Sequence, residues 1–323
     1  MSINDELYDA IGTDGYGVDA SEYISRGTIM GIDRIVGPGS VPRKILSGFE
    51  FLEGPVWHSA RQALLFSDII GDAMYRWTKA RGLEEFRKPS HMANGNTLDR
   101  EGRLLTCEHA TSRVSRSDDN GNYEVLASHY QGSALNSPND IVVKRDGSVY
   151  FTDPDSGRSA KYGIERPREL EFQGVYRLDP DSSELRLLID DFSKPNGLCF
   201  SLDESVLFVN DTDRQHVRAF DVMPDGGINN DRVWTETGGN MPGVADGMKI
   251  DSAGNLYCCG SGGIHVFDPG GTRICVIETP EVAANFTWAG DDRTELYITA
   301  THSIYRLNVK VPGHDPIAAC DTN

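Results

Sequence analysis

A segment that recurs six times limits the fold more than any other feature of this sequence. The copies read EGPVWHSARQALLFSD from Glu53, NGNTLDREGRLLTCEH from Asn94, NDIVVKRDGSVYFTD from Asn139, NGLCFSLDESVLFVND from Asn196, DGMKIDSAGNLYCCG from Asp246 and NFTWAGDDRTELYITA from Asn285. Each copy begins with a polar or acidic residue, continues as an alternating segment, passes a polar turn and enters a β-prone run. A third β-like run follows each copy, for example VYRL from Val175.

The spacing of the copies indicates what they build. Their starts are separated by 41, 45, 57, 50 and 39 residues, and one blade of four antiparallel strands requires about 40 to 45 residues. Most copies also have a fourth β-like segment, such as LEEFRKP from Leu83. The sequence therefore predicts an all-β fold, a six-bladed β-propeller.

The last copy lacks a fourth segment, because the chain after Leu307 runs through KVPGHDPIAACDTN to its end. A matching segment, RKILSGFEFLEGP from Arg43, lies directly before the first copy. We expect it to pair with the last blade, which closes the ring and leaves no open sheet edge. The predicted organisation is an N-terminal extension over residues 1–42 (a tail, an arm or a lid), the propeller over 43–310 and a C-terminal tail over 311–323.

The charge and the cysteines exclude several classes of protein. The net charge of -18 argues against nucleic acid or an anionic membrane as partner, since both require a basic surface. No apolar run reaches the length of about 18 residues that a membrane-spanning helix requires. The start, MSINDELYDAIGTDGYG, resembles no secretory signal, which predicts a cytoplasmic protein. A monomer and a homodimer are both open. The six cysteines, with Cys258 and Cys259 adjacent in a β-like run, fit reduced core residues.

The six residues that begin the copies point to a metal site. The first strand of each blade lines the channel of a propeller, so we expect these side chains to converge there. They are one glutamate, one aspartate and four asparagines, and burying them without partners would be costly. Carboxylate and amide oxygens suit a hard divalent cation such as Ca²⁺, here held by Glu53, Asn139, Asn196 and Asp246. The alternative is a water-filled polar channel without a metal.

Several motifs resemble those of a known family. EGPVW, NGNTLDREGRLLTCEH, LNSPNDIVV, VYFTDP, KPNGLCFS, DGMKID and LYITATHSIYRL are similar, in the same order, to motifs of the SMP-30/gluconolactonase/luciferin-regenerating family, in particular its bacterial gluconolactonases. The resemblance covers residues 43–308. It implies a propeller with one catalytic divalent ion, Ca²⁺ first, with Zn²⁺, Mg²⁺ or Mn²⁺ as alternatives. It places the ligands on Glu53, Asn196 and Asp246, with Asn139 as a fourth ligand or a substrate contact.

The resemblance also implies a reaction, the hydrolysis of a sugar lactone such as glucono-1,5-lactone. Relatives with the same ligands hydrolyse other lactones or organophosphate esters, and one class is better described as calcium-binding. The cation would polarise the lactone carbonyl and stabilise the charge that develops on its oxygen. Asp246 would act as general base or as nucleophile, and Glu53 would anchor the ion.

Substrate contacts are expected from Asn94, Asn139, His109 and Arg113. His109 is a pocket residue or a structural histidine, and Arg113 neutralises the acid product or is a solvated surface arginine. Carboxylates at the ends of the second β-like runs could contact the substrate, order the ligands or cap loops; they are Asp68, Glu108, Asp153 and Asp211.

Other activities find less support in the sequence. It contains no G-x-S-x-G, H-E-x-x-H, P-loop or complete G-x-G-x-x-G motif. Cys107 and His109 alone fall short of the four ligands of a zinc site. A propeller used as an interaction scaffold, with a structural ion at most, is the main alternative. Since a scaffold does not require a converging polar ring, the sequence favours the enzyme.

Overall fold

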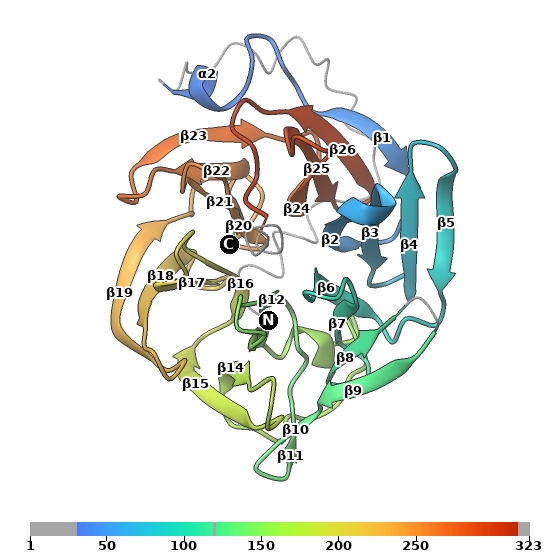
Figure 1. Cartoon of the computed structure of the whole chain (residues 1–323), viewed down its shortest axis with the longest axis vertical. Helices are drawn as coiled ribbons and strands as arrows, with labels where there is room; N and C mark the ends of the chain where they lie inside the picture. The colour runs from blue at the N-terminus through green and yellow to red at the C-terminus, as the bar shows by residue number, and fades with distance from the viewer. Residues whose placement is uncertain (1–30, 119–120, 316–323) are drawn as a thin grey trace.

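The computed structural model describes residues 31–118 and 121–315, and these form a ring of six antiparallel sheets around a central channel (Figure 1). Each sheet has four strands, and in the first five blades the order in space follows the order in the chain. The predicted six-bladed β-propeller is therefore confirmed.

The blades divide the chain as follows. Blade 1 contains β2 (Leu52–His58), β3 (Ala63–Asp68), β4 (Ala73–Thr78) and β5 (Gly82–Arg87), and blade 2 contains β6 (Ala93–Leu98), β7 (Leu104–Glu108), β8 (Arg113–Ser117) and β9 (Tyr123–Ala127). Blade 3 contains β12 (Ile141–Val143), β13 (Val149–Asp153), β14 (Gln173–Leu178) and β15 (Leu185–Phe192), and blade 4 contains β16 (Pro195–Phe200), β17 (Val206–Asp211), β18 (His216–Val222) and β19 (Ile228–Glu236). Blade 5 contains β20 (Met248–Ile250), β21 (Leu256–Gly260), β22 (Gly263–Phe267) and β23 (Arg273–Glu278).

Blade 6 is closed by the two ends of the propeller. It contains β24 (Ala283–Ala289), β25 (Glu295–Ala300), β26 (Ser303–Asn308) and, as its outer strand, β1 (Arg43–Ser47). β1 lies antiparallel to β26, with Leu46 opposite Ile304 and Ser47 opposite Ser303. The predicted closure by an N-terminal strand is thus confirmed, and Figure 1 shows the two strands side by side.

The core lies between neighbouring blades and explains the apolar runs of the second strands. Successive side chains of a strand point to opposite faces of its sheet. In β13, Tyr150 packs toward blade 4 against Phe200, with ring centroids 4.9 Å apart, whereas Phe151 packs on Tyr176 toward blade 2. Because both faces of each blade are covered, both side chains are fully buried.

The segments outside the blades are short. They are α2 (Ile32–Ile35), the 3₁₀ turns η2 (Ser59–Arg61) and η3 (Ser156–Arg158), and a small hairpin of β10 (His129–Tyr130) and β11 (Ser133–Ala134). Ile35 is buried in the core between blades 5 and 6, and Val36 pairs with Val309. Gly313 pairs with Asp251 of blade 5. Residues 1–30 and 316–323 lie outside the described residues, so the roles of the two predicted extensions stay predictions.

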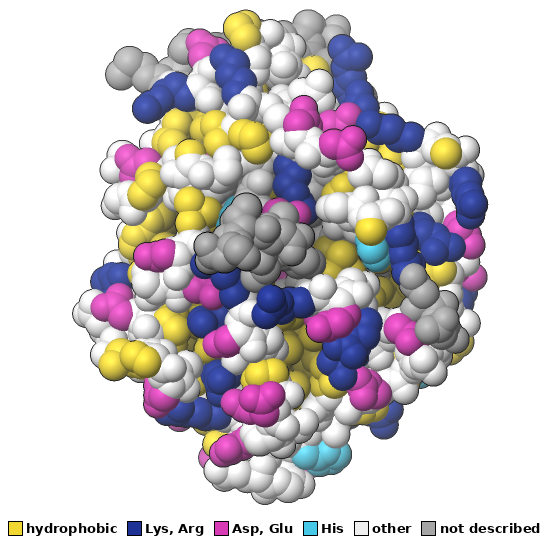
Figure 2. Space-filling model, in the orientation of Figure 1, with side chains coloured by type: hydrophobic (Ala, Val, Ile, Leu, Met, Phe, Trp, Pro, Cys, Tyr) yellow, Lys and Arg dark blue, Asp and Glu magenta, His cyan; other side chains and the backbone are white. Residues whose placement is uncertain are grey.

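The surface carries both charges. Figure 2 shows basic side chains scattered among acidic ones on the face seen in Figure 1. In the described part of the chain, no helix is long and apolar enough to cross a membrane. Five cysteines, Cys107, Cys199, Cys258, Cys259 and Cys275, are buried and form no disulfide among the described residues.

Candidate active site

The residues that begin the repeats converge at one cavity in the channel. Glu53, Asn94, Asn139, Asn196 and Asp246 all line this cavity, whose volume is about 70 Å³. Each comes from the start of the first strand of its blade or from the residues just before that strand. The structure therefore brings together the four predicted metal ligands and three of the four predicted substrate contacts, Asn94, His109 and Asn139.

The sixth residue, Asn285, does not line the cavity but supports one that does. Its Nδ2 donates to Oε2 of Glu53 at 3.0 Å. The backbone N–H of Gly54 donates to the same oxygen at 2.6 Å. These two hydrogen bonds orient the Glu53 carboxylate. Asn285 therefore belongs to the site although it does not line the cavity.

Glycines that follow the ring residues allow the first strands to approach one another. A Cβ atom at Gly95 would lie 2.4 Å from the backbone oxygen of Asn139 in the next blade, and one at Gly197 would lie 2.3 Å from that of Asp246. Real Cβ atoms do not approach a backbone oxygen so closely. The glycines are therefore required by the narrow channel, and they set the ring residues side by side.

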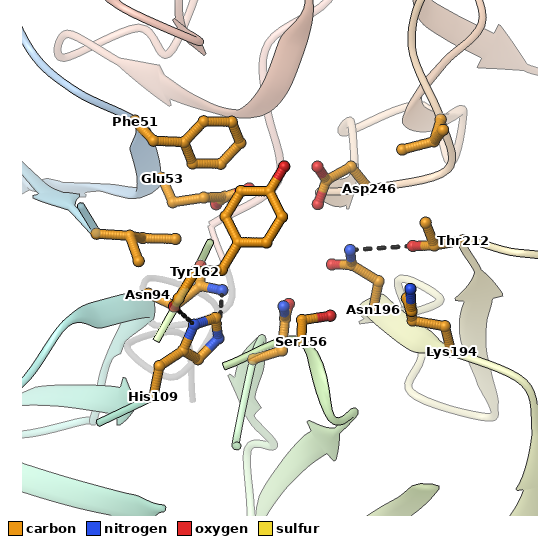
Figure 3. A pocket seen from close by; sticks show the side chains of 13 residues that line it. Phe51, Glu53, Asn94, His109, Ser156, Tyr162, Lys194, Asn196, Thr212 and Asp246 are labelled. Carbon is orange, nitrogen blue, oxygen red and sulfur yellow. Dashed lines mark hydrogen bonds between the residues drawn. The ribbon is translucent and has the colours of Figure 1, made fainter. Parts of the chain in front are cut away.

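Glu53 and Asp246 form a buried pair of like charges. Their exposed fractions are 4% and 7%, and Figure 3 shows their carboxylates pointing toward one another. Burial raises the pKa of Asp246, and repulsion from Glu53 and Asp140 raises it further. Burial likewise raises the pKa of Glu53, with a contribution from Asp140. Two carboxylates in this position repel each other unless a cation or a shared proton lies between them.

Asn196 has a defined amide orientation. The hydroxyl of Thr212 donates to the backbone oxygen of Ala245 at 2.7 Å, so Oγ1 can accept from Nδ2 of Asn196 at 3.1 Å. The amide oxygen of Asn196 then lies on the opposite side, toward the cavity (Figure 3). Thr212 thus presents an oxygen of Asn196, the atom that a hard cation would bind.

These side chains fit a hard divalent cation. Two of the four proposed ligands are carboxylates and two are asparagine amides. The site is therefore not a cluster of three or more His, Cys, Asp and Glu, and the described residues contain no such cluster that could hold a metal. Such an all-oxygen set, with two negative charges and neutral carbonyls, is the chemistry that Ca²⁺ takes. It lacks the nitrogen or sulfur ligands that softer ions favour.

The cavity also has walls that the sequence analysis did not identify. They are Phe51, Ile69, Ser156, Tyr162, Lys194, Thr212 and Val244. Phe51 and Lys194 stand beside the EGP and PNG motifs, so their positions carried a signal. Lys194 lines the cavity and its side chain is partly exposed, so it brings a cation to the cavity edge. Its Nζ lies 3.5 Å from Oδ1 of Asp213.

Ser156 and Tyr162 belong to an insertion, residues 154–172, between β13 and β14. The long spacing of 57 residues between Asn139 and Asn196 was its sequence signal. The buried guanidinium of Arg158 donates to the backbone oxygens of Asn136 and Leu135, at 2.8 and 2.6 Å, and so fastens the insertion to the segment that precedes β12. The insertion thus forms one side of the cavity.

The aromatic ring of Tyr162 connects this insertion to blade 1. It packs against Phe51 with ring centroids 5.3 Å apart. The two rings give the cavity an apolar part, beside the carboxylates and amides of the ring residues (Figure 3).

His109 lines the cavity and is held at both ring nitrogens. Nδ1 lies 2.8 Å from the backbone oxygen of Tyr162, and Nε2 lies 2.9 Å from Nδ2 of Asn94. The side chain is 1% exposed. Burial lowers the pKa of His109 to about 4, and the nearby Arg166 contributes to the decrease. His109 is therefore a neutral imidazole at neutral pH.

Arg113, the remaining predicted substrate contact, does not line the cavity. It lies at the start of β8, opposite Glu108 in the register of β7 and β8. The cation beside the cavity is instead Lys194, on another blade. A substrate contact by Arg113 stays a prediction that this geometry does not favour.

The carboxylates at the ends of the second strands have structural partners. Asp68 accepts from the backbone N–H of Phe51 at 2.9 Å, and Asp153 accepts from that of Asn136 at 2.8 Å. Asp211 accepts from that of Ser193 at 2.9 Å, and Glu108 pairs with Arg87. Of the three roles considered for these residues, the contacts of Asp68, Asp153 and Asp211 are those of loop caps, whereas the ion pair of Glu108 was not among the roles expected.

Comparison with known proteins adds a family to this geometry. Residues 51–302 match the model of the SMP-30/gluconolactonase/LRE-like region. The chain is 31% identical to a gluconolactonase of Zymomonas mobilis, a match that covers 87% of this chain and 85% of the relative. It is 25% identical to a pentonolactonase of Haloferax volcanii, over 80% of this chain and 84% of the relative.

A solved structure agrees with these matches. A gluconolactonase of Xanthomonas campestris superposes with a TM-score of 0.80 at 32% identity. The superposition covers 86% of this chain and 92% of that chain. The similarity thus extends over the propeller and the cavity.

Proposed function

The chain belongs to the SMP-30/gluconolactonase/LRE-like family, and on this premise we propose that it hydrolyses a sugar lactone to the open-chain acid with the help of one divalent cation. The observation that carries the proposal is the buried pair Glu53 and Asp246, which face each other among asparagine amides. Similar proteins are gluconolactonases and a pentonolactonase, which supports a lactonase. Glucono-1,5-lactone is the substrate that we propose first.

The cation would be held by Glu53, Asn139, Asn196 and Asp246. When bound, such an ion supplies a Lewis acid for the ester carbonyl and balances the two carboxylates. Ca²⁺ fits this oxygen-only set best; Mg²⁺ and Mn²⁺ also accept oxygen ligands, and Zn²⁺ commonly takes nitrogen or sulfur as well.

Asp246 is the proposed catalytic residue. Its carboxylate lines the cavity, so it can take a proton from an attacking water or attack the lactone carbonyl itself. In the second case, water must hydrolyse the acyl-enzyme afterwards. Lys194 lies at the cavity edge, where an ammonium group can pair with the carboxylate of the acid product.

Two other functions are less favoured. An interaction scaffold does not require two carboxylates, those of Glu53 and Asp246, to face each other in a cavity. Hydrolysis of a less polar lactone or ester, or of an organophosphate, is favoured by one specific feature, the apolar wall of Phe51, Ile69 and Tyr162.

The test is a pH-stat assay of D-glucono-1,5-lactone hydrolysis, corrected for the spontaneous rate. Protein stripped of metal would be assayed with Ca²⁺, Zn²⁺, Mg²⁺ or Mn²⁺ restored, beside Asp246→Asn. We expect activity that disappears with chelator, returns with one divalent ion, and falls at least about 10³-fold in Asp246→Asn, because both versions of the mechanism require this carboxylate.

Asp251→Asn is the matched control, since Asp251 is a buried aspartate of the same blade that does not line the cavity. This variant should keep its dependence on the ion. Folded, metal-loaded protein that is inactive with every ion would contradict the sugar lactonase and direct the assay to less polar esters.

A further inference from the structure

The contacts of His109 determine which ring nitrogen carries hydrogen. A backbone carbonyl only accepts hydrogen bonds, so the 2.8 Å contact with the oxygen of Tyr162 requires a hydrogen on Nδ1. The ring is buried and neutral, and a neutral imidazole has one N–H group. Nε2 is therefore an acceptor.

An acceptor at Nε2 in turn determines the orientation of Asn94. The atom 2.9 Å away must be a donor, which is Nδ2 of the Asn94 amide. Oδ1 is then turned away from the imidazole. Asn94 is 3% exposed and lines the cavity, and among residues 31–118 and 121–315 no side chain or backbone group is found to donate to this oxygen.

We propose that His109 is a positioning residue, which holds the Asn94 amide so that Oδ1 accepts a hydrogen bond from a hydroxyl group of the lactone. This inference rests on the proposed function and specifies its substrate class. The site would prefer a hydroxylated lactone to a lactone of the same ring size without hydroxyl groups. His109 itself would touch the substrate only through Asn94.

The physical basis of this preference is the cost of an unpaired acceptor. A substrate without hydroxyl groups would displace water from Oδ1 of Asn94 and offer no donor in its place, and a buried polar atom without a partner is unfavourable. The amide cannot rotate to avoid this, because rotation would place its oxygen against the lone pair of Nε2. The backbone oxygen of Tyr162 therefore connects the insertion to substrate recognition.

The tautomer can be measured without any substrate. In the full chain labelled with ¹⁵N at histidine, we expect His109 to be a neutral imidazole with hydrogen on Nδ1. His265 is an internal control in the same spectrum, because its Nε2 lies 2.8 Å from the backbone oxygen of Ser261, which requires hydrogen on Nε2. Hydrogen on Nε2 of His109 would overturn the proposal.

The substrate preference is measured with two lactones, glucono-1,5-lactone and δ-valerolactone, which has no hydroxyl groups. In Asn94→Ala and His109→Phe, we expect the ratio of the two kcat/KM values to fall about tenfold, mainly through a higher KM for gluconolactone. The double variant should lose no more than either single variant, because both remove the same hydrogen bond.

Controls separate this inference from the proposed function. His265→Phe also replaces a buried histidine and should leave the ratio unchanged. Should His109→Phe fail to fold, Asn94→Ala and the tautomer still decide the question. Wild-type protein that hydrolyses neither lactone would contradict the proposed function, whereas active wild type with an unchanged ratio in Asn94→Ala would contradict only this inference.

Discussion

At the scale of single residues, the site consists of polar groups whose orientation is set by a second residue. Asn285 donates to Glu53, Thr212 accepts from Asn196, and His109 accepts from Asn94. A supporting hydrogen bond of this kind orients a ligand before the ion binds. The orientation of the ring residues therefore depends on the hydrogen bonds of these supporting residues.

The first prediction concerns Asn285. In Asn285→Ala, Glu53 loses one of its two donors, and we expect the affinity for Ca²⁺ to fall roughly ten- to hundredfold, as measured by isothermal titration calorimetry. Asn255→Ala is the matched control, because Nδ2 of Asn255 donates to the carboxylate of Asp251 at 2.7 Å, outside the cavity. Equal Ca²⁺ affinities in Asn285→Ala and wild type would show that Glu53 needs no such support.

At the scale of elements, the site depends on the close approach of first strands and on the insertion of blade 3. Gly197 at the start of β16 nearly touches the backbone of Asp246 from the next blade. The insertion places Tyr162 above the ring and is fastened by Arg158. Contacts between elements of different blades thus determine the geometry of the cavity.

The second prediction tests the approach of β16 to blade 5. In Gly197→Ala, the added Cβ would lie 2.3 Å from the backbone oxygen of Asp246, so the strands must move apart. We expect a loss of about 3 kcal/mol in the free energy of unfolding, together with weaker Ca²⁺ binding. Denaturant titration gives the first quantity. Gly270→Ala is the control, since its Cβ would meet only Oδ1 of Asp268 at 3.3 Å; similar losses in both variants would argue against the proposed clash.

At the scale of the whole molecule, the ring is held closed by β1 and by one half-buried carboxylate, that of Glu281. Glu281 accepts from Lys44 of β1 at 2.9 Å and from Ser303 and Tyr305 of β26 at 2.7 and 2.8 Å. These hydrogen bonds join β1 and β26, the first and the last strand of the propeller in the chain. Closure makes the six blades one cooperative unit.

The third prediction concerns removal of the closing strand. Deletion of residues 1–47 would expose the edge of β26 and remove the contacts of Ile35 and Leu46 in the core. We expect at least about 3 kcal/mol of lost stability, with aggregation seen by size-exclusion chromatography. Deletion of residues 1–30 leaves every described contact in place and is the control. A monomeric, fully stable 48–323 protein would contradict the role of closure.

The fourth prediction concerns acid. Burial alone would raise the pKa of Glu281, but hydrogen bonds from Ser303 and Lys44 lower it. A lowered pKa in the folded protein contributes stability above the unfolded pKa, about 4.3 for glutamate, and the contribution is lost as the pH falls through the folded pKa. The difference in Tm between wild type and Glu281→Gln should therefore be largest above about pH 5 and decrease at lower pH.

The control for this measurement is Glu184→Gln, since Glu184 is exposed and forms no ion pair among the described residues. Its Tm should follow that of wild type at every pH. A difference for Glu281→Gln that is constant between pH 3 and pH 7 would show that its charge makes no contribution.

Much of this molecule could be predicted from local patterns. The repeat spacing predicted six blades, and the missing fourth segment after Leu307 predicted closure by the segment from Arg43. The positions at which the repeats begin also predicted which residues meet in the channel, because equivalent positions of a closed ring lie at the same height. These features follow from strand periodicity and repeat order, which are properties of the chain itself.

The walls of the cavity and the direction of its amides depend on tertiary contacts that the local patterns do not encode. Tyr162 contacts His109 from 53 residues away, and Asn285 contacts Glu53 from 232 residues away. Such contacts depend on the paths of loops across neighbouring blades, which no periodicity along the chain encodes. The same holds for Arg113, which the tertiary structure places outside the cavity. Strand patterns determine where a residue lies within its blade, whereas packing between blades determines what it faces.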